Sequence, residues 1–216
     1  GLGDVYKRQD EGYTLDVTPQ GVTVKAKTPQ GLFYGMQTFM QLLPAEIQSP
    51  AVVNGIAWTA SCVTVKDEPR FEYRGIMLDP CRHFIPVENV KKHLDVLALF
   101  KINRMHWHLT DDQGWRIEIK KYPELTDFAA WRPYSCYTEW YYGDRRYCHR
   151  DDPAAEGGYY MQEEIREVVE YARALHITVI PEIEMPSHSE EVLAAYPQLS
   201  LSLIHISEPT RQAEIS

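Results

Sequence analysis

The sequence predicts an α/β protein with a parallel sheet, preceded by a small α+β unit. After Pro69, apolar runs and amphipathic stretches alternate as strand, helix, strand, helix, strand, the order of a parallel sheet with right-handed crossovers. Before Pro69 the pattern is an alternating hairpin, one helix and one strand. The 216 residues are 44% hydrophobic and 25% charged, an average globular composition that excludes disordered, collagen-like and coiled-coil chains.

The small α+β unit is expected to open with an antiparallel hairpin. Residues 13–18 and 22–26 each alternate apolar with polar side chains, and Pro19, Gln20 and Gly21 supply the turn. A helix is expected over residues 31–43, ending before Pro44, and a strand over residues 62–66. We expect this partial accessory domain to cover residues 10–68.

The parallel sheet is expected to contain three strands joined by two helices, within a domain that covers residues 69–200. The strands are predicted at residues 75–78, 104–109 and 177–183. Pro86 opens the first helix, since proline suits a first helical turn. Each helix has one apolar face, formed by Val87, Val90, Leu94 and Leu97 in the first and by Ile165, Val168, Val169, Ala172 and Leu175 in the second.

Residues 113–160 form a segment too long for an ordinary connection between a strand and a helix, which indicates either function or disorder. Its aromatic content argues against disorder. The rings are Trp131, Tyr134, Tyr137, Trp140, Tyr141, Tyr142 and Tyr147. Such rings stack on the apolar face of a sugar, cover a subunit contact or fold onto their own loop, and the sequence leaves all three uses open.

Both ends of the chain differ from its middle. With one choice of codons, the reverse complement of residues 1–9 encodes residues 201–209. Natural proteins have no reason to carry one oligonucleotide in opposite orientations at their two ends. We therefore expect residues 1–9 and 201–216 to be a translated sequencing adapter on a fragment, and we exclude them from fold reasoning.

The charge balance restricts the partners. Lys and Arg number 22 against 31 Asp and Glu, a net charge of −9 that repels phosphate, so nucleic acid and anionic membrane surfaces are disfavoured. No apolar run approaches the ~20 residues that a transmembrane helix needs, and no secretion signal precedes Gly1. Neutral or cationic ligands fit this charge better.

Polar side chains gather at the three strands, whose ends carry the chemistry in parallel α/β folds. Arg74 adjoins the first strand, Asp111 follows the second, and Glu184 and His188 follow the third. An arginine fork clamps hydroxyls or carboxylates, and carboxylates beside histidine tune each other's pKa for acid and base work. Each residue alone is compatible with a structural ion pair, but their grouping at successive strands favours a catalytic site.

A metal site is the main alternative. His106 and His108 lie two residues apart on a strand and share a face, as metal-dependent barrel hydrolases require. The sequence around residues 181–188 offers no matching histidine cluster. We therefore expect two packed, hydrogen-bonded histidines and no metal or other cofactor.

Four motifs together resemble the glycoside hydrolase family 20 β-N-acetylhexosaminidases. They are GLFYGMQTFMQLLP (31–44), YRGIMLDPCRHF (73–84), HWHLTDDQGWRIEI (106–119) and VIPEIEMPSH (179–188), in matching order and spacing. The resemblance covers nearly all of residues 10–200. It implies the family's α+β domain followed by the N-terminal half, about three strands, of a (β/α)8 TIM barrel.

The resemblance also implies hydrolysis of terminal β-linked N-acetylglucosamine or N-acetylgalactosamine from glycans. In this family the sugar's own acetamido oxygen attacks the anomeric carbon, so no enzyme carboxylate is the nucleophile. An Asp-Glu pair from strand four assists, and we expect that pair to lie beyond this chain and the fragment itself to be inactive. A catalytically dead glycan-binding homologue is the non-enzyme alternative.

By resemblance, Arg74 holds sugar hydroxyls, Asp111 belongs to the active-site network, and Glu184 and His188 support proton transfer to the general acid. Glu184 stands where the family more often has Asp, Ser187 where it has Gly, and Met161 where it often has a helix-capping Thr. The first two departures alter the network's expected geometry.

The sequence contains four cysteines and does not decide whether any of them form a disulfide. Only Cys136 and Cys148 lie within one loop, and a disulfide there or free buried thiols both fit the sequence. The resemblance implies an exported enzyme, periplasmic, secreted or on the outer surface. The sequence does not predict linkage preference or oligomeric state.

Overall fold

The computed structural model describes residues 10–200 of the chain. Both stretches expected to be adapter, 1–9 and 201–216, lie outside the described residues. The described residues form two compact units. The first comprises residues up to 75 together with 94–103 and 175–177, and the second comprises 76–93, 104–174 and the residues from 178 onward.

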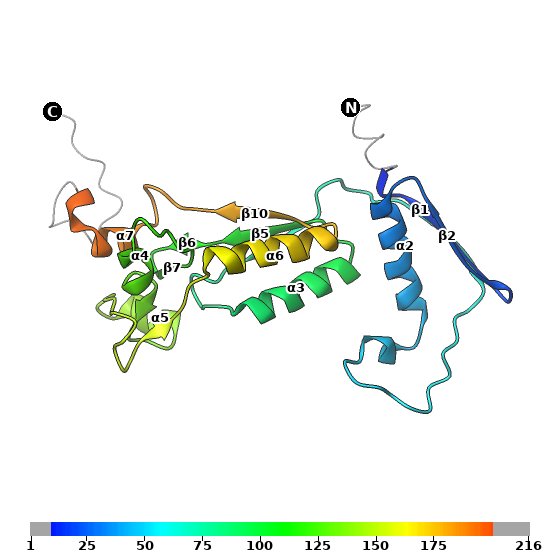
Figure 1. Ribbon diagram of the computed structural model, residues 1–216, viewed down its shortest axis with the longest axis horizontal. Coiled ribbons are helices and arrows are strands. Elements are labelled where there is room, and N and C mark those ends of the chain that lie inside the picture. The colour runs from blue at the N-terminus through cyan, green and yellow to red at the C-terminus, as the bar shows by residue number, and fades with distance from the viewer. Residues whose placement is uncertain (1–9, 201–216) are drawn as a thin grey trace. The chain divides into compact units, whose positions relative to one another are not determined.

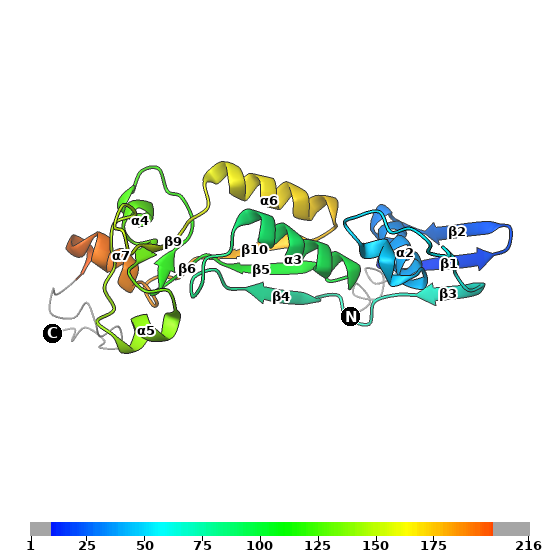
Figure 2. The ribbon, with the colours of Figure 1, turned by 90° about the horizontal axis from the view of Figure 1, so that it is seen from below.

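The first unit contains a three-stranded antiparallel sheet, of which Figure 1 labels β1 and β2 and Figure 2 all three strands. β1 (Tyr13–Thr18) is its central strand and pairs with β2 (Gly21–Ala26) on one side and β3 (Val63–Asp67) on the other. The predicted hairpin is confirmed, and β3 lies one residue later than the predicted 62–66. Tyr13, Leu15 and Val17 alternate along β1 and are all buried, so one face of the sheet forms the core of this unit.

The helix of the first unit packs closely on that face. α2 (Pro29–Leu42) begins two residues before the predicted start, because the Thr28 hydroxyl caps it by accepting from the Gly31 amide at 3.1 Å. A Cβ at Gly35 would lie 2.4 Å from the Val24 side chain, so only glycine allows this approach. A short 3-10 helix, η1 (Ala45–Gln48), follows.

The second unit contains the parallel arrangement. β5 (Arg104–His108) lies between β4 (Gly75–Leu78) and β10 (Thr178–Glu182), as Figure 2 shows. β5 and β10 run parallel with His108 opposite Glu182. The three predicted strands are therefore present, and their order fits the opening of a β/α barrel.

Two helices accompany the sheet on one side (Figures 1 and 2). They are α3 (Val87–Leu99) and α6 (Gln162–Ala174), and both have the apolar faces that periodicity predicted. Val90 and Leu94 of α3 and Val168 and Ala172 of α6 are fully buried. Among residues 10–200, no helix combines the length and apolar character needed to cross a membrane.

The long segment between β5 and α6 is ordered rather than structureless. It forms two small antiparallel ribbons, β6 with β7 and β8 with β9, and two short helices. The elements are β6 (Thr110–Asp111), β7 (Gly114–Trp115), α4 (Glu124–Asp127), β8 (Trp131–Arg132), α5 (Tyr137–Tyr142) and β9 (Glu156–Gly157). After β10 follow α7 (Glu190–Ala195) and η2 (Pro197–Leu199).

Arg116 holds this segment together. It is 1% exposed, and its guanidinium donates to five backbone carbonyls at 2.6 to 3.3 Å, those of Pro80, Cys81, Gln113, Ala130 and Gly158. Burial lowers the pKa of the guanidinium to about 10. A Cβ at Gly114 would lie 2.4 Å from Arg116 Cζ, so glycine leaves room for it. One side chain thus joins the segment after β4 to the loops after β5.

Candidate active site at the strand ends

Polar side chains meet where the three strands of the second unit end. Asp79 follows β4, Asp111 and Asp112 follow β5, and Glu182 ends β10. Glu184 and His188 come next along the chain. The carboxyl ends of parallel strands meet at one edge of a sheet, which is where barrel enzymes place their catalytic groups.

Asp111 is the centre of this group. Its side chain is 2% exposed, and Oδ2 lies 2.8 Å from both Arg82 Nη2 and His108 Nε2. The Asp112 amide donates to Oδ1 at 2.8 Å. Burial alone would raise the pKa of Asp111, but the His108 hydrogen bond and the Arg82 charge outweigh it and lower the pKa. Asp111 is therefore a buried carboxylate that stays ionised.

Arg82 is the arginine at this edge. Its Nη1 lies 3.0 Å from Asp79 Oδ2 while its Nη2 contacts Asp111. Asp79 also accepts from the Cys81 and Arg82 amides, which shapes the turn after β4. Arg82 was not among the site residues predicted from the sequence, although it follows the end of the predicted strand at residues 75–78.

Arg74, the predicted sugar-binding arginine, is not brought to this group. It precedes β4 and belongs to the first unit. Its Nη1 lies 2.8 Å from Glu11 Oε2, and its guanidinium donates to the Phe71 and Lys101 carbonyls. Arg74 therefore contacts residues of its own unit, and its role in holding sugar hydroxyls stays a prediction.

His188 and Glu184 lie near the acids in different ways. His188 Nδ1 is 3.3 Å from Asp112 Oδ2 and 3.5 Å from Asp111 Oδ1, with its ring half exposed. The Glu184 amide donates to Thr110 Oγ1 at 2.7 Å. The Glu184 carboxylate can approach His108 and Glu182 within 4.8 Å. The predicted residues Asp111, Glu184 and His188 thus come from adjoining segments of one edge.

His106 and His108 both face Glu182. Its Oε2 lies 2.7 Å from His106 Nε2 and hydrogen-bonds to His108 Nδ1. The hydrogen bond to Asp111, followed by that to Glu182, raises the pKa of His108 to about 9. Within residues 10–200, three sets of side chains could together reach one ion, and His108 belongs to two of them. Its ring nitrogens already face carboxylates, in line with the expected hydrogen-bonded histidines.

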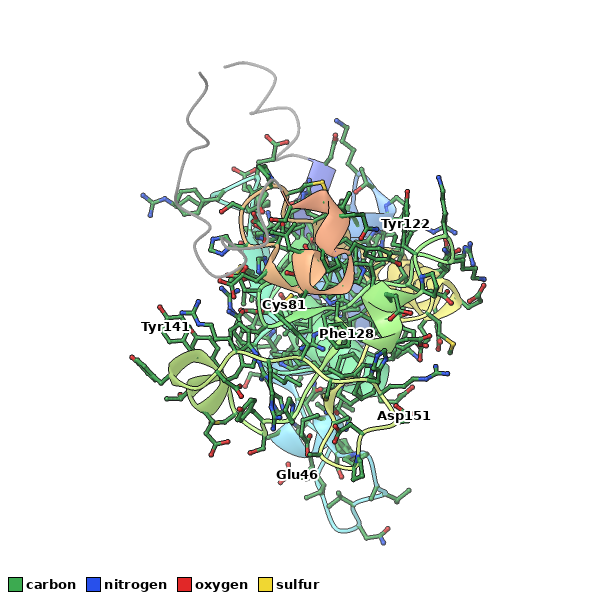
Figure 3. The ribbon with its side chains drawn as sticks, turned by 90° about the vertical axis from the view of Figure 1, so that its left-hand side faces the viewer. Glu46, Cys81, Tyr122, Phe128, Tyr141 and Asp151 are labelled. Atoms are coloured by element: carbon green, nitrogen blue, oxygen red, sulfur yellow. The ribbon has the colours of Figure 1, made fainter. Side chains whose placement is uncertain are left out.

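The aromatic segment contacts the site and also folds onto itself. The Tyr147 hydroxyl donates to the Asp112 carbonyl, and Arg145 pairs with Glu190 at 3.1 Å. Trp140 is buried against Tyr147, as the self-packing alternative requires. Tyr142 is 82% exposed, and Figure 3 shows Tyr141 pointing outward from α5. Because these two rings point outward, stacking on a sugar and covering a subunit contact both remain open as uses for them.

The cysteines are all free. Cys81 and Cys148 are buried, while Cys62 and Cys136 are exposed. Burial raises the pKa of the Cys81 thiol, whose Sγ donates to the His108 carbonyl at 3.0 Å. The structure therefore has no bond between Cys136 and Cys148, and Cys81 packs as an inert thiol behind β5.

Two family models match the chain. Residues 71–215 match the catalytic domain of glycosyl hydrolase family 20, and residues 3–68 match domain 2 of that family. A beta-hexosaminidase of Porphyromonas gingivalis is 50% identical over 200 residues, which are 93% of this chain and 24% of the relative. One from Vibrio furnissii is 43% identical over 190 residues, 88% of this chain and 29% of the relative.

The chain is also similar to solved structures of enzymes named as hexosaminidases or N-acetylglucosaminidases. The Streptomyces plicatus N-acetyl-beta-hexosaminidase, in complex with Thio-NAglucal, has a TM-score of 0.71 and 40% identity over 89% of this chain and 35% of that one. An exo beta-N-acetylglucosaminidase from Vibrio harveyi, in complex with N-acetylglucosamine, has a TM-score of 0.72 and 36% identity over 90% of this chain and 28% of that one. The chain spans about a quarter to a third of the length of these proteins.

Proposed function

Because the chain belongs to glycosyl hydrolase family 20, we propose that the whole protein removes terminal N-acetylglucosamine or N-acetylgalactosamine from β-linked glycans. The proposal is supported by relatives named beta-hexosaminidase at 50% and 43% identity. The observation that carries it within this chain is the buried, ionised Asp111, held by Arg82 and His108 at the strand ends. A glycan is the substrate class, and an exported location remains a prediction.

The chemistry we propose is substrate-assisted. The acetamido carbonyl oxygen of the sugar attacks its own anomeric carbon as the bond to the leaving oxygen breaks, and a general acid protonates that oxygen. Water then opens the cyclic intermediate and returns the sugar with its original β configuration. Such a reaction needs no enzyme nucleophile, and we propose that an Asp-Glu pair outside this chain orients the acetamido group and supplies the general acid.

We assign supporting roles to the residues described here. Asp111 and His188 lie 3.5 Å apart and form the start of a proton path in which Glu184 takes part. Arg82, rather than Arg74, is the arginine we propose for the sugar hydroxyls, because it lies at the strand ends beside Asp111. Its planar fork suits neighbouring hydroxyls, and Asp79 and Asp111 hold the fork in place.

The test is a pair of chromogenic substrates that differ only in the acetamido group. We expect the whole protein to hydrolyse 4-nitrophenyl N-acetyl-β-glucosaminide and to leave 4-nitrophenyl β-glucoside nearly untouched, because the glucoside lacks the internal nucleophile. Asp111→Asn is expected to lower kcat/KM by about 100-fold or more, the scale of lost acid-base assistance. Asp151→Asn makes the same change at an exposed position and should keep full activity.

Three results would contradict the proposal. Absence of turnover of the acetamido substrate at every pH would exclude the activity. Equal turnover of both substrates would exclude assistance by the acetamido group. Loss of activity after chelation would instead favour the metal-dependent alternative built on His106 and His108.

A further inference from the structure

The Glu182 carboxylate contacts two histidines, His106 and His108, next to the proposed site. The parallel register of β5 and β10 places Glu182 opposite His108 and Ile180 opposite His106. Side chains two residues apart on a strand share a face, so both rings reach the same Glu182 oxygen. Oε2 lies 2.7 Å from His106 Nε2 and hydrogen-bonds to His108 Nδ1. The His108 side chain is only 7% exposed, so water cannot readily replace this carboxylate.

The other nitrogen of His108 faces a second carboxylate. Nε2 lies 2.8 Å from Asp111 Oδ2, while Arg82 contacts the same oxygen at 2.8 Å. An ionised carboxylate only accepts hydrogen bonds, so a ring with a carboxylate at each nitrogen needs a proton on both. The geometry therefore favours the imidazolium form of His108, with Glu182 on one side and Asp111 on the other.

Arg82 offers a competing arrangement. Its Nη1 lies 3.0 Å from His108 Nε2, so a neutral ring could accept from it there. In that form the Nε2 lone pair would face the Asp111 oxygen at 2.8 Å, which is repulsive. Arg82 Nη1 already has Asp79 as an acceptor at 3.0 Å. Asp79, Asp111 and Glu182 thus surround Arg82 and the His108 ring, and this excess of carboxylates favours the protonated ring.

We propose that Glu182 is a positioning residue that keeps His108 doubly protonated and aims its Nε2 proton at Asp111. Asp111 then remains an anion, fixed between His108 and Arg82 at the end of the sheet. His106 contacts the same Glu182 oxygen at 2.7 Å. What Asp111 does to a substrate rests on the proposed function, but the protonation of His108 does not.

The groups that face His108 come from every neighbouring segment. Glu182 and Glu184 approach from β10 and the residues after it, and Asp111 from β6. Arg82 and Asp79 approach from the turn after β4. Among the described residues Glu182 alone hydrogen-bonds to Nδ1, so its removal takes away that hydrogen bond while the Asp111 side is untouched.

The test measures the ¹⁵N chemical shifts of the two His108 ring nitrogens by NMR in the 216-residue chain. The His108→Gln variant identifies their signals. Both nitrogens are expected to be protonated at pH 7.5, with a titration midpoint near a pKa of about 9. In Glu182→Gln the midpoint should fall by about one unit or more, towards the ordinary value of 6.5. Glu167→Gln removes an exposed carboxylate of α6 that pairs with Lys91 instead, and it should leave the His108 midpoint unchanged.

A neutral His108 at pH 7.5, with an unprotonated Nε2 that accepts from Arg82, would overturn the proposal. So would a midpoint that Glu182→Gln does not move. The nitrogen shifts of the unsubstituted chain decide the protonation state even if Glu182→Gln fails to fold. No substrate enters this experiment, so its result is independent of the hydrolysis assay.

Discussion

Replacing Arg116 with lysine should destabilise the second unit selectively. Arginine has five N–H donors, and in Arg116 they serve five backbone carbonyls in a fully buried position. Lysine has three donors, so at least two of the five carbonyls lose their hydrogen bond from residue 116. The carbonyls of Pro80, Cys81 and Gly158 have no second donor among the described residues, so any of them that lysine does not reach would be left unpaired. Each buried acceptor left without one costs about 1 to 3 kcal/mol, and we expect Arg116→Lys to lower the free energy of unfolding by about 3 kcal/mol.

Urea unfolding followed by tryptophan fluorescence measures this loss, and hydrogen exchange by mass spectrometry locates it. Peptides that contain β5 and β7 should exchange faster in Arg116→Lys, whereas peptides of β1 and β2 should keep their protection. Arg166→Lys is the matched control, since Arg166 is an exposed arginine of α6 and such changes stay within about 0.5 kcal/mol. An Arg116→Lys chain as stable as the Arg166→Lys chain would refute the reasoning.

Two other measurements test the core and the charge network. Leu15→Ala leaves a cavity at a fully buried position of β1 and should lower the free energy of unfolding by about 2 to 5 kcal/mol, measured as faster hydrogen exchange of the β1 and β2 amides. Val63→Ala, at a 36% exposed position, should lower it far less. Equal losses in the two variants would contradict the described core. The hydrogen bond to Asp111, then that to Glu182, raises the pKa of His108 from 6.5 to about 9, so the folded state keeps a proton that the unfolded state has lost. The resulting stability, about 3 kcal/mol, is complete below pH 6.5 and lost as pH rises through 9. Urea midpoints that stay flat from pH 6.5 to 9 would exclude it.

Local periodicity predicted the elements well. The hairpin, α2, α3, α6 and the three parallel strands all lie within two residues of their expected starts or ends. Each depends on neighbours in sequence: alternation in a strand, one apolar face in a helix, a proline or a capping threonine at a boundary. The small ribbons and short helices of the aromatic segment were not predicted, because two-residue strands carry no measurable period.

The site was predicted in part. Asp111 and His188 adjoin as expected, since both follow strand ends that a parallel sheet brings to one edge. Arg74 was chosen although it precedes its strand, and the rule that carboxyl ends carry the chemistry would have selected Arg82. Glu182 was missed because its partners follow from the register between β5 and β10, which no single-strand pattern reveals. Arg116 was missed because its five acceptors come from loops that only the fold brings together.

The sequence separations within the charge network imply an order of assembly during synthesis. His108 meets Arg82 across 26 residues, but it meets Glu182 across 74. At roughly 5 to 20 residues per second, Glu182 leaves the ribosome about 4 to 15 s after His108. During that interval Arg82 can already neutralise Asp111, while nothing yet draws a proton to Nδ1. A carboxylate on each side of the His108 ring is therefore present only after β10 adds to β5, so docking of the third strand completes the charge network.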